Sequence, residues 1–265
     1  MKKIFITLSS IFLLASCANE ESTFNLPVEN NSVTGNVISF ADYYDFITAN
    51  THDKALVSNI SYINSTGALN SLSASRANST NPYILKLNGN TFTPSYIYNS
   101  PTGSTYQLDD SSLTNFFGKK LKIDFTTTDL VLTDNTNFDV YIPNLLTVSV
   151  SNLINGQLQP GTKITWNADS QNTNGVVLSA EYNPLTQPDE KISTTYPNRI
   201  SGGLTFEDSG SYTIQKEDLE NFPKGSNITF SIGRAGFIIT NNGDITEDLS
   251  FGAYTMVKGE YEINY

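Results

Sequence analysis

The chain has few of the side chains from which most enzymes build an active site. Its 265 residues include one cysteine, Cys17, and one histidine, His52. A Ser–His–Asp triad would have to use His52, and a metal site could draw on only one histidine ligand. The Gly-x-Ser-x-Gly, P-loop and Gly-x-Gly-x-x-Gly patterns are missing, which argues against serine-hydrolase and nucleotide chemistry. We therefore expect no catalytic residue, no resident metal and no cofactor.

Basic residues are scarce as well. Lys and Arg number 15 against 26 Asp and Glu, which gives a net charge of −11. Proteins that bind nucleic acid neutralise its phosphates with Lys and Arg, so we do not expect nucleic acid as a partner. After the N-terminal segment, no stretch approaches the 18 or more apolar residues of a transmembrane helix.

The N-terminus has the pattern of an export signal. Lys2 and Lys3 precede an apolar run from Ile4 to Leu14, the order of a charged n-region and a short h-region. Leu14–Cys17 (LASC) then resembles the lipobox of bacterial lipoproteins. The resemblance implies that residues 1–16 are a signal peptide and that Cys17 is lipidated, which anchors the protein stably through several acyl chains. A plain signal peptide followed by an incidental cysteine is the alternative.

The residues after Cys17 bear on where the protein is sorted. Ala18 replaces the Asp that favours inner-membrane retention, and Asn19–Ser22 resembles the acidic export signal of Bacteroidota surface lipoproteins. These resemblances imply a bacterial outer-membrane protein exposed on the cell surface, although an acidic solvated leash would have the same composition. Residues 17–32 hold the lipidated cysteine and a flexible acidic tether.

From Val33 onward the composition favours β-strands. Runs rich in Val, Ile, Thr, Tyr and Phe recur between turn residues. The clearest runs are Leu56–Ile63, Tyr83–Leu87, Leu121–Phe125, Leu146–Val150, Lys163–Trp166, Val176–Tyr182, Asn227–Ile232 and Tyr254–Val257. Asn88-Gly89 suits the positive φ angles of a type I′ turn, so Leu85–Leu87 and Thr91–Thr93 are expected to form a hairpin.

An internal repeat suggests how these strands are organised. Tyr106, Leu108, Leu113, Asn115 and Phe116 match Tyr212, Ile214, Leu219, Asn221 and Phe222 at a constant offset of 106 residues, as comparison of the two segments shows. We interpret each copy as a strand, one helical turn and a second strand, with the turn leucine plugging the end of a sandwich.

This turn is similar to the connection between the fifth and sixth strands of an immunoglobulin-like domain. The second copy resembles the Ig-like modules of Bacteroidota lipoproteins. The resemblance implies an all-β chain with two tandem Ig-like antiparallel β-sandwiches, over residues 33–137 and 138–265. One large jelly roll with a chance internal similarity is the alternative.

Candidate site residues are few. Tyr96 and Tyr98 would share a strand face and could stack on sugar rings, although strands also use aromatics for packing. Trp166 lies in an alternating strand and is expected to be a core anchor. Carboxylates that could serve a glycoside hydrolase are Asp109, Asp110, Asp189, Glu190, Glu207 and Asp208. Oxygen-rich loops that could hold a structural Ca²⁺ are Asp134–Asp139, Asn167–Gln171 and Asn242–Asp244.

These observations together indicate a lipid-anchored cell-envelope protein that binds a partner and is not an enzyme. The partner would be a glycan or another envelope protein, contacted by loops on a rigid β scaffold. One alternative is a glycan-binding accessory lipoprotein of a polysaccharide-uptake system, which the arrangement resembles. A carboxylate-dependent glycoside hydrolase and a purely structural spacer are the others.

Overall fold

The computed structural model of the chain describes residues 55–64, 68–77, 83–92, 96–100, 103–127, 136–240 and 248–265. Strands dominate these residues and the helices among them are short, so the expected all-β class is confirmed. The expectations for the signal peptide, Cys17, the tether and His52 lie outside the described residues. Among the described segments, no helix is long and apolar enough to cross a membrane.

The described strands form three sheets. The largest has eight strands in the order β12-β11-β14-β15-β1-β2-β6-β5. In chain order these are β1 (Ala55–Asn64), β2 (Ala68–Ala77), β5 (Tyr96–Ser100), β6 (Gly103–Asp109), β11 (Val176–Tyr182), β12 (Ile200–Phe206), β14 (Asn227–Thr240) and β15 (Asp248–Glu262). A four-stranded sheet holds β4 (Asn90–Phe92), β3 (Tyr83–Leu87), β7 (Lys119–Thr127) and β8 (Thr136–Ile142). A three-stranded sheet holds β13 (Ser211–Thr213), β10 (Lys163–Trp166) and β9 (Val148–Ser151).

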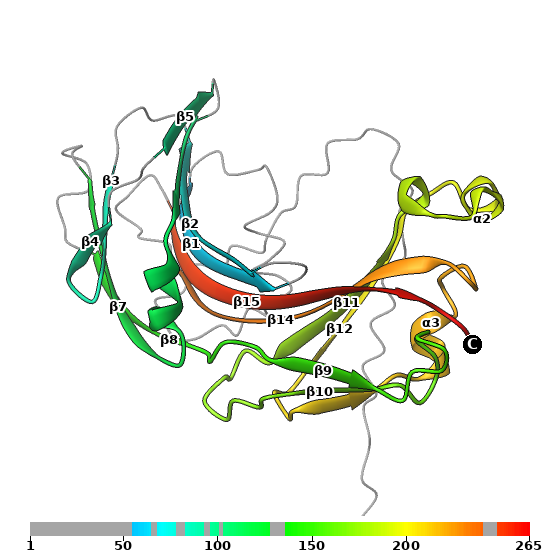
Figure 1. Cartoon of the computed structure of the whole chain (residues 1–265). Helices are drawn as coiled ribbons and strands as arrows, with labels where there is room; N and C mark the ends of the chain where they lie inside the picture. Colours follow the sequence, from blue (N-terminus) through cyan, green and yellow to red (C-terminus); the bar gives the residue numbers. More distant parts are fainter. Residues whose placement is uncertain are drawn as a thin grey trace, which may run out of the picture.

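Two long strands, β14 and β15, connect strands β1–β8 with strands β9–β13, and we call these two groups of strands the halves of the molecule. β14 and β15 pair antiparallel from Asn227↔Glu262 to Thr240↔Leu249, and β15 also pairs in parallel with β1. Figure 1 shows this ribbon curving across the molecule, from the region of β1 and β2 to the C-terminus. The eight-stranded sheet therefore contains strands from both sides of the expected boundary between residues 137 and 138. That boundary itself falls within β8, which pairs with β7.

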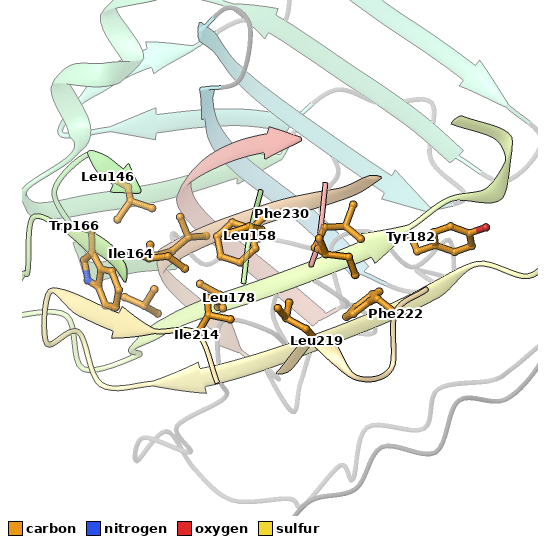
Figure 2. Packing of buried hydrophobic residues seen from close by; sticks show 14 residues of the cluster. Leu146, Leu158, Ile164, Trp166, Leu178, Tyr182, Ile214, Leu219, Phe222 and Phe230 are labelled. Carbon is orange, nitrogen blue, oxygen red and sulfur yellow. The ribbon is translucent and has the colours of Figure 1, made fainter. Parts of the chain in front are cut away.

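Two main groups of buried side chains lie along this sheet. The first group joins the eight-stranded and four-stranded sheets and includes Leu87, Leu113, Leu121 and Ile142 together with Phe251 of β15. The second lies between the eight-stranded and three-stranded sheets. Figure 2 shows it with Trp166 at one end and Tyr182 at the other; its members include Leu146, Leu158, Ile164, Leu178, Ile214, Leu219, Phe222 and Phe230. Burying each such side chain contributes about 1.5–3 kcal/mol, so both groups are major sources of stability.

The internal repeat has the predicted local structure. β6 leads into the 3₁₀ helix η1 (Ser111–Phe116) and then β7, and β13 leads into α3 (Lys216–Leu219) and then β14. Leu113 and Leu219 are 0% and 2% exposed, each in its own core group. In both copies the helical turn carries the chain from one sheet to another. The expected burial of these two leucines is confirmed.

The turns follow the predicted chemistry in part. Asn88 and Gly89 have φ angles of 50° and 80°, as a type I′ turn requires, and they join β3 to β4. Asn155 and Gly156 adopt the same conformation between the bridged residues Ile154 and Gln157. The connection from β11 to β12 instead contains two short helices, η2 (Pro184–Thr186) and α2 (Glu190–Thr195).

Candidate functional site

The two halves meet where β8 crosses β14. The crossing is at Gly236 of β14, where an added Cβ would collide with the backbone carbonyl oxygen of Tyr141 and would lie 2.9 Å from Cα of Ile142. Only glycine lets the two backbones approach this closely. The contact aligns the end of the four-stranded sheet with the loop between β10 and β11.

A buried ion pair lies beside this crossing. The guanidinium of Arg234 in β14 and the carboxylate of Asp208 are 2.8 Å apart, and their side chains are 0% and 2% exposed. A buried charge is tolerated only when it is paired and hydrogen-bonded. Arg234 and Asp208 must therefore keep their polar contacts for the fold to be stable.

The remaining hydrogen-bonding groups of the pair are also used. Arg234 donates from Nε to the Asn144 carbonyl at 3.0 Å and from a terminal nitrogen to the Asn167 carbonyl at 2.8 Å. Asp208 accepts from Trp166 Nε1 at 2.7 Å and from Asn172 Nδ2 at 2.9 Å. One buried pair thus connects β14, the segment after β8 and the loop after β10.

A second carboxylate fastens the same loop. Asp169 is 5% exposed and accepts from the Tyr141 hydroxyl at 2.9 and 3.1 Å, from both nitrogens of Asn144 at 2.9 Å, and from the Gln171 amide at 3.1 Å. Burial alone would raise the pKa of Asp169. The hydrogen bonds from Asn144, Tyr141 and Gln171, with the nearby charge of Arg234, outweigh burial and hold the pKa below its usual value.

These bonds shape a hollow that we call the junction groove. It has a volume of about 230 Å³, and it is bounded by β8, by the loop before β11 and by β14. Its lining residues are Asp139, Val140, Tyr141, Gln171, Asn172, Thr173, Asn174, Phe237 and Ile238. The groove combines one carboxylate, three amides and two hydroxyls with the aromatic rings of Tyr141 and Phe237.

The polar groups of the groove divide into fixed and available ones. Asn172 donates to the Gly175 carbonyl, and Asn174 donates to the Ala235 carbonyl at 3.0 Å, so both amides hold the loop. Among the described residues, no hydrogen bond or ion pair involves the exposed carboxylate of Asp139. Asp139 is thus available to accept hydrogen bonds from a ligand.

The phenol of Tyr141 stays protonated throughout the physiological range. Burial raises its pKa to about 12, and the hydrogen bond to Asp169 and that carboxylate's charge act in the same direction. Because its proton is donated to Asp169, Tyr141 contributes a fixed ring rather than a free donor. The ring is therefore preorganised as one wall of the groove.

Several of the carboxylates proposed from the sequence hold local structure, and the Asp109 side chain lies outside the described residues. Asp110 caps η1 by accepting from Ser112 N at 2.7 Å, and Asp189 caps α2 by accepting from Lys191 N at 2.8 Å. Asp208 is committed to Arg234. Glu190 and Glu207 are exposed. Asp110, Asp189 and Asp208, which the sequence suggested as catalytic carboxylates, therefore act as helix caps and as one partner of an ion pair.

Two of the loops considered for calcium meet at the groove. Asp139 and Gln171 line it together, although they come from segments about thirty positions apart in the sequence. Asp169 of the second loop accepts protein donors on both oxygens. Among the described residues, no three His, Cys, Asp or Glu side chains gather as metal ligands. Asp134 and Asn135 of the first loop and all of Asn242–Asp244 lie outside those residues, and the side chains of Thr136 and Asn137 are not described.

The remaining predicted site is the pair Tyr96 and Tyr98. Both belong to β5, the edge strand next to β6, with Tyr96 opposite Gln107 and Tyr98 opposite Thr105. Their side chains lie outside the described part of the structure. Trp166 is 7% exposed within the second core group, which confirms its role as a core anchor.

Sequence reasoning missed Arg234 and Phe237. A charged residue within Ile232–Ile239 (IGRAGFII) carries no pattern that separates a buried arginine from an exposed one, and the predicted strand ended at Ile232. Comparison with models of protein families and with curated proteins gives no match to this chain.

Proposed function

We propose that this chain is a lipid-anchored cell-envelope protein that binds a glycan in the junction groove. The lipobox at Cys17 supports the anchor, and the polar, aromatic lining of the groove supports the ligand class. In this proposal the body is two Ig-like sandwiches fused through a shared sheet, and the acidic tether holds it at the surface of the outer membrane.

One observation carries the proposal. The groove is formed by β8 of the four-stranded sheet, the loop before β11 and β14 of the eight-stranded sheet, and it is held by buried hydrogen bonds on Arg234, Asp208 and Asp169. A site with such support keeps its shape before the ligand arrives, which lowers the cost of ordering on binding. The Asp139 carboxylate would accept hydrogen bonds from sugar hydroxyls, and the Thr173 hydroxyl would donate to them or accept from them. The rings of Tyr141 and Phe237 would contact apolar sugar faces.

The binding test is a glycan-array screen of residues 18–265, followed by titration of the best hit. This segment keeps every residue that the structure describes. We expect Asp139→Asn and Thr173→Ala to weaken the hit at least about tenfold, because the first replaces a charged acceptor with a neutral amide and the second removes a hydroxyl. Glu190→Gln and Thr186→Ala change exposed residues of the same types outside the groove and should leave the affinity unchanged.

Tyr96→Ala and Tyr98→Ala decide between the groove and the sequence-predicted face. Binding that is lost in these variants but kept in Asp139→Asn would move the site to β5 and contradict the groove. A blank array would contradict a glycan ligand. The anchor is tested separately by labelling cells with an alkyne fatty acid, where Cys17→Ser should abolish labelling and release the protein from the membrane fraction.

A further inference from the structure

One edge of the eight-stranded sheet is unusually open. β12 is its last strand and pairs with β11 on one side only. Its five central residues, from Ser201 to Thr205, are exposed, and Leu204 keeps 39% of its surface accessible. An edge strand presents a row of backbone N–H and C=O groups that another strand can pair with.

The other described edges are shorter or covered. β13 and β4 have three residues each and β9 has four, whereas β12 has seven. β8 crosses over β14 at Gly236. β5 has five residues, and its side chains lie outside the described residues.

β12 also lacks the usual protection of an edge. Its sequence from Ile200 to Phe206 is ISGGLTF, with no charged residue, no proline and two adjacent glycines. Natural edge strands often contain Lys, Pro or an inward-pointing charge, and these residues prevent another strand from pairing with the edge. The absence of all three over seven residues indicates that this edge is built to be paired.

The charges that flank β12 identify the partner. Arg199 precedes the strand and Glu207 follows it, and both are exposed. In an antiparallel pairing of two copies centred on Gly203, Arg199 of each copy lies opposite Glu207 of the other. Directly opposed residues of an antiparallel pair point to the same face of the joined sheet, so the two side chains would be neighbours.

The rest of the register is also complementary. Ile200 lies opposite Phe206, Ser201 opposite Thr205, and Leu204 opposite Gly202, so a large side chain covers a glycine. Arg199 bonds Glu181 of its own copy at 3.2 Å, but its side chain remains 64% exposed and can bond a second carboxylate. Among the described residues, no hydrogen bond or ion pair involves the Glu207 side chain.

We propose that β12 pairs antiparallel with β12 of a second copy about a twofold axis at Gly203, joining the two eight-stranded sheets into one. This inference is independent of the groove and of any glycan. An isologous contact of this kind closes after two copies and leaves both grooves in the dimer.

A cysteine scan tests the register. Residues 18–265 contain no cysteine, so an introduced thiol is the only one. Opposed residues of an antiparallel pair have Cα atoms about 4.5–5.5 Å apart, within disulfide range. Gly203→Cys should therefore cross-link with itself under mild oxidation, and its Cβ would meet no atom closer than 3.4 Å. Ser201→Cys alone should not, because its own copy lies about 13 Å away along the strand.

Charge reversal tests the partner's identity. Dimerisation is measured by sedimentation at concentrations up to about 100 µM. Arg199→Glu and Glu207→Arg should each raise the dissociation constant of the dimer about tenfold, because each makes both Arg199–Glu207 contacts between the copies repulsive. The double variant should restore it. Leu204→Lys should give monomer, whereas Leu185→Lys, which changes a leucine that is 86% exposed elsewhere, should not.

Two results would overturn the proposal. The first is a wild-type chain that stays monomeric over the whole concentration range, which would leave the edge to a strand from a different protein. The second is a dimer that survives Leu204→Lys and gives no Gly203→Cys cross-link, which would place the contact elsewhere. Circular dichroism of each variant shows whether loss of the dimer comes from loss of the fold.

Discussion

At the scale of single residues, the interior of this protein depends on a charge that hydropathy would place outside. Arg234 and Asp208 are buried together with an N–O distance of 2.8 Å. Removing one partner of such a pair leaves the other as an uncompensated buried charge. We expect Asp208→Ala to lower the free energy of unfolding by about 3–5 kcal/mol, measured by urea denaturation.

The matched control is the exposed pair Arg199–Glu181, at 3.2 Å with side chains 64% and 46% exposed. Glu181→Ala should cost less than about 1 kcal/mol, because solvent screens an exposed pair. Equal losses in the two variants would mean that burial of Arg234 does not set the cost. The same experiment would then also remove the argument for a preorganised groove.

Asp169 gives the molecule a defined acid response. Its native pKa lies below its usual value of 3.8, so the stabilisation it provides is complete above about pH 4 and is lost as the pH falls through the native pKa. Asp169→Asn carries no titrating group, so its urea midpoint should fall less than that of the wild type between about pH 5 and pH 3. A slope in Asp169→Asn equal to that of the wild type would refute the assignment.

At the scale of elements, the two helical turns of the repeat are equivalent in burial. Leu113 and Leu219 are 0% and 2% exposed in the two core groups. Each Leu→Ala change removes buried surface and leaves a cavity, so each should cost about 2–5 kcal/mol by chemical denaturation. Leu185→Ala, at 86% exposure, should cost less than about 0.5 kcal/mol. A small effect at one of the two leucines would show that the repeat is not structurally equivalent.

The elements were also the level at which the sequence was most informative. Tyr83–Leu87, Lys163–Trp166 and Val176–Tyr182 were predicted with the bounds they have in β3, β10 and β11, because turn residues delimit β-rich runs there. β14 was predicted only over Asn227–Ile232, since Gly233, Arg234 and Gly236 interrupt the hydrophobic pattern. Those three positions are explained by packing: Gly236 admits the β8 backbone, and Arg234 pairs with a carboxylate 26 residues away.

The groove could be predicted only in its pieces. The oxygen-rich segments containing Asp139 and Asp169 were identified, but as calcium ligands, because local sequence shows which atoms a loop offers and not which donors the fold brings to them. Tyr141 and Asn144 lie within hydrogen-bond distance of Asp169 only because β8 crosses β14 in the folded chain. Phe237 lines the groove from the part of β14 after Ile232, which the sequence did not predict as strand.

At the scale of the whole molecule, the shared sheet makes the halves interdependent. β1 pairs with β15 across a separation of 193 residues, from Ala55↔Asp248 onward, and no local pattern encodes such a contact. Phe251 of β15 packs in the first core group, while Ile263, just beyond the end of the same strand, packs in the second. Loss of one core would therefore release strands that the other core needs.

This coupling can be measured with one side chain. Trp166, the only tryptophan of the chain, lies in the second core group, whereas Leu113 lies in the first. We expect Leu113→Ala to shift the unfolding transition seen by Trp166 fluorescence as far as the one seen by far-ultraviolet circular dichroism, because a cooperative unit unfolds as a whole. Independent sandwiches would instead leave the fluorescence transition in place and make the dichroism curve biphasic. Since β14 and β15 run through both cores, coincident transitions are the outcome that the topology requires.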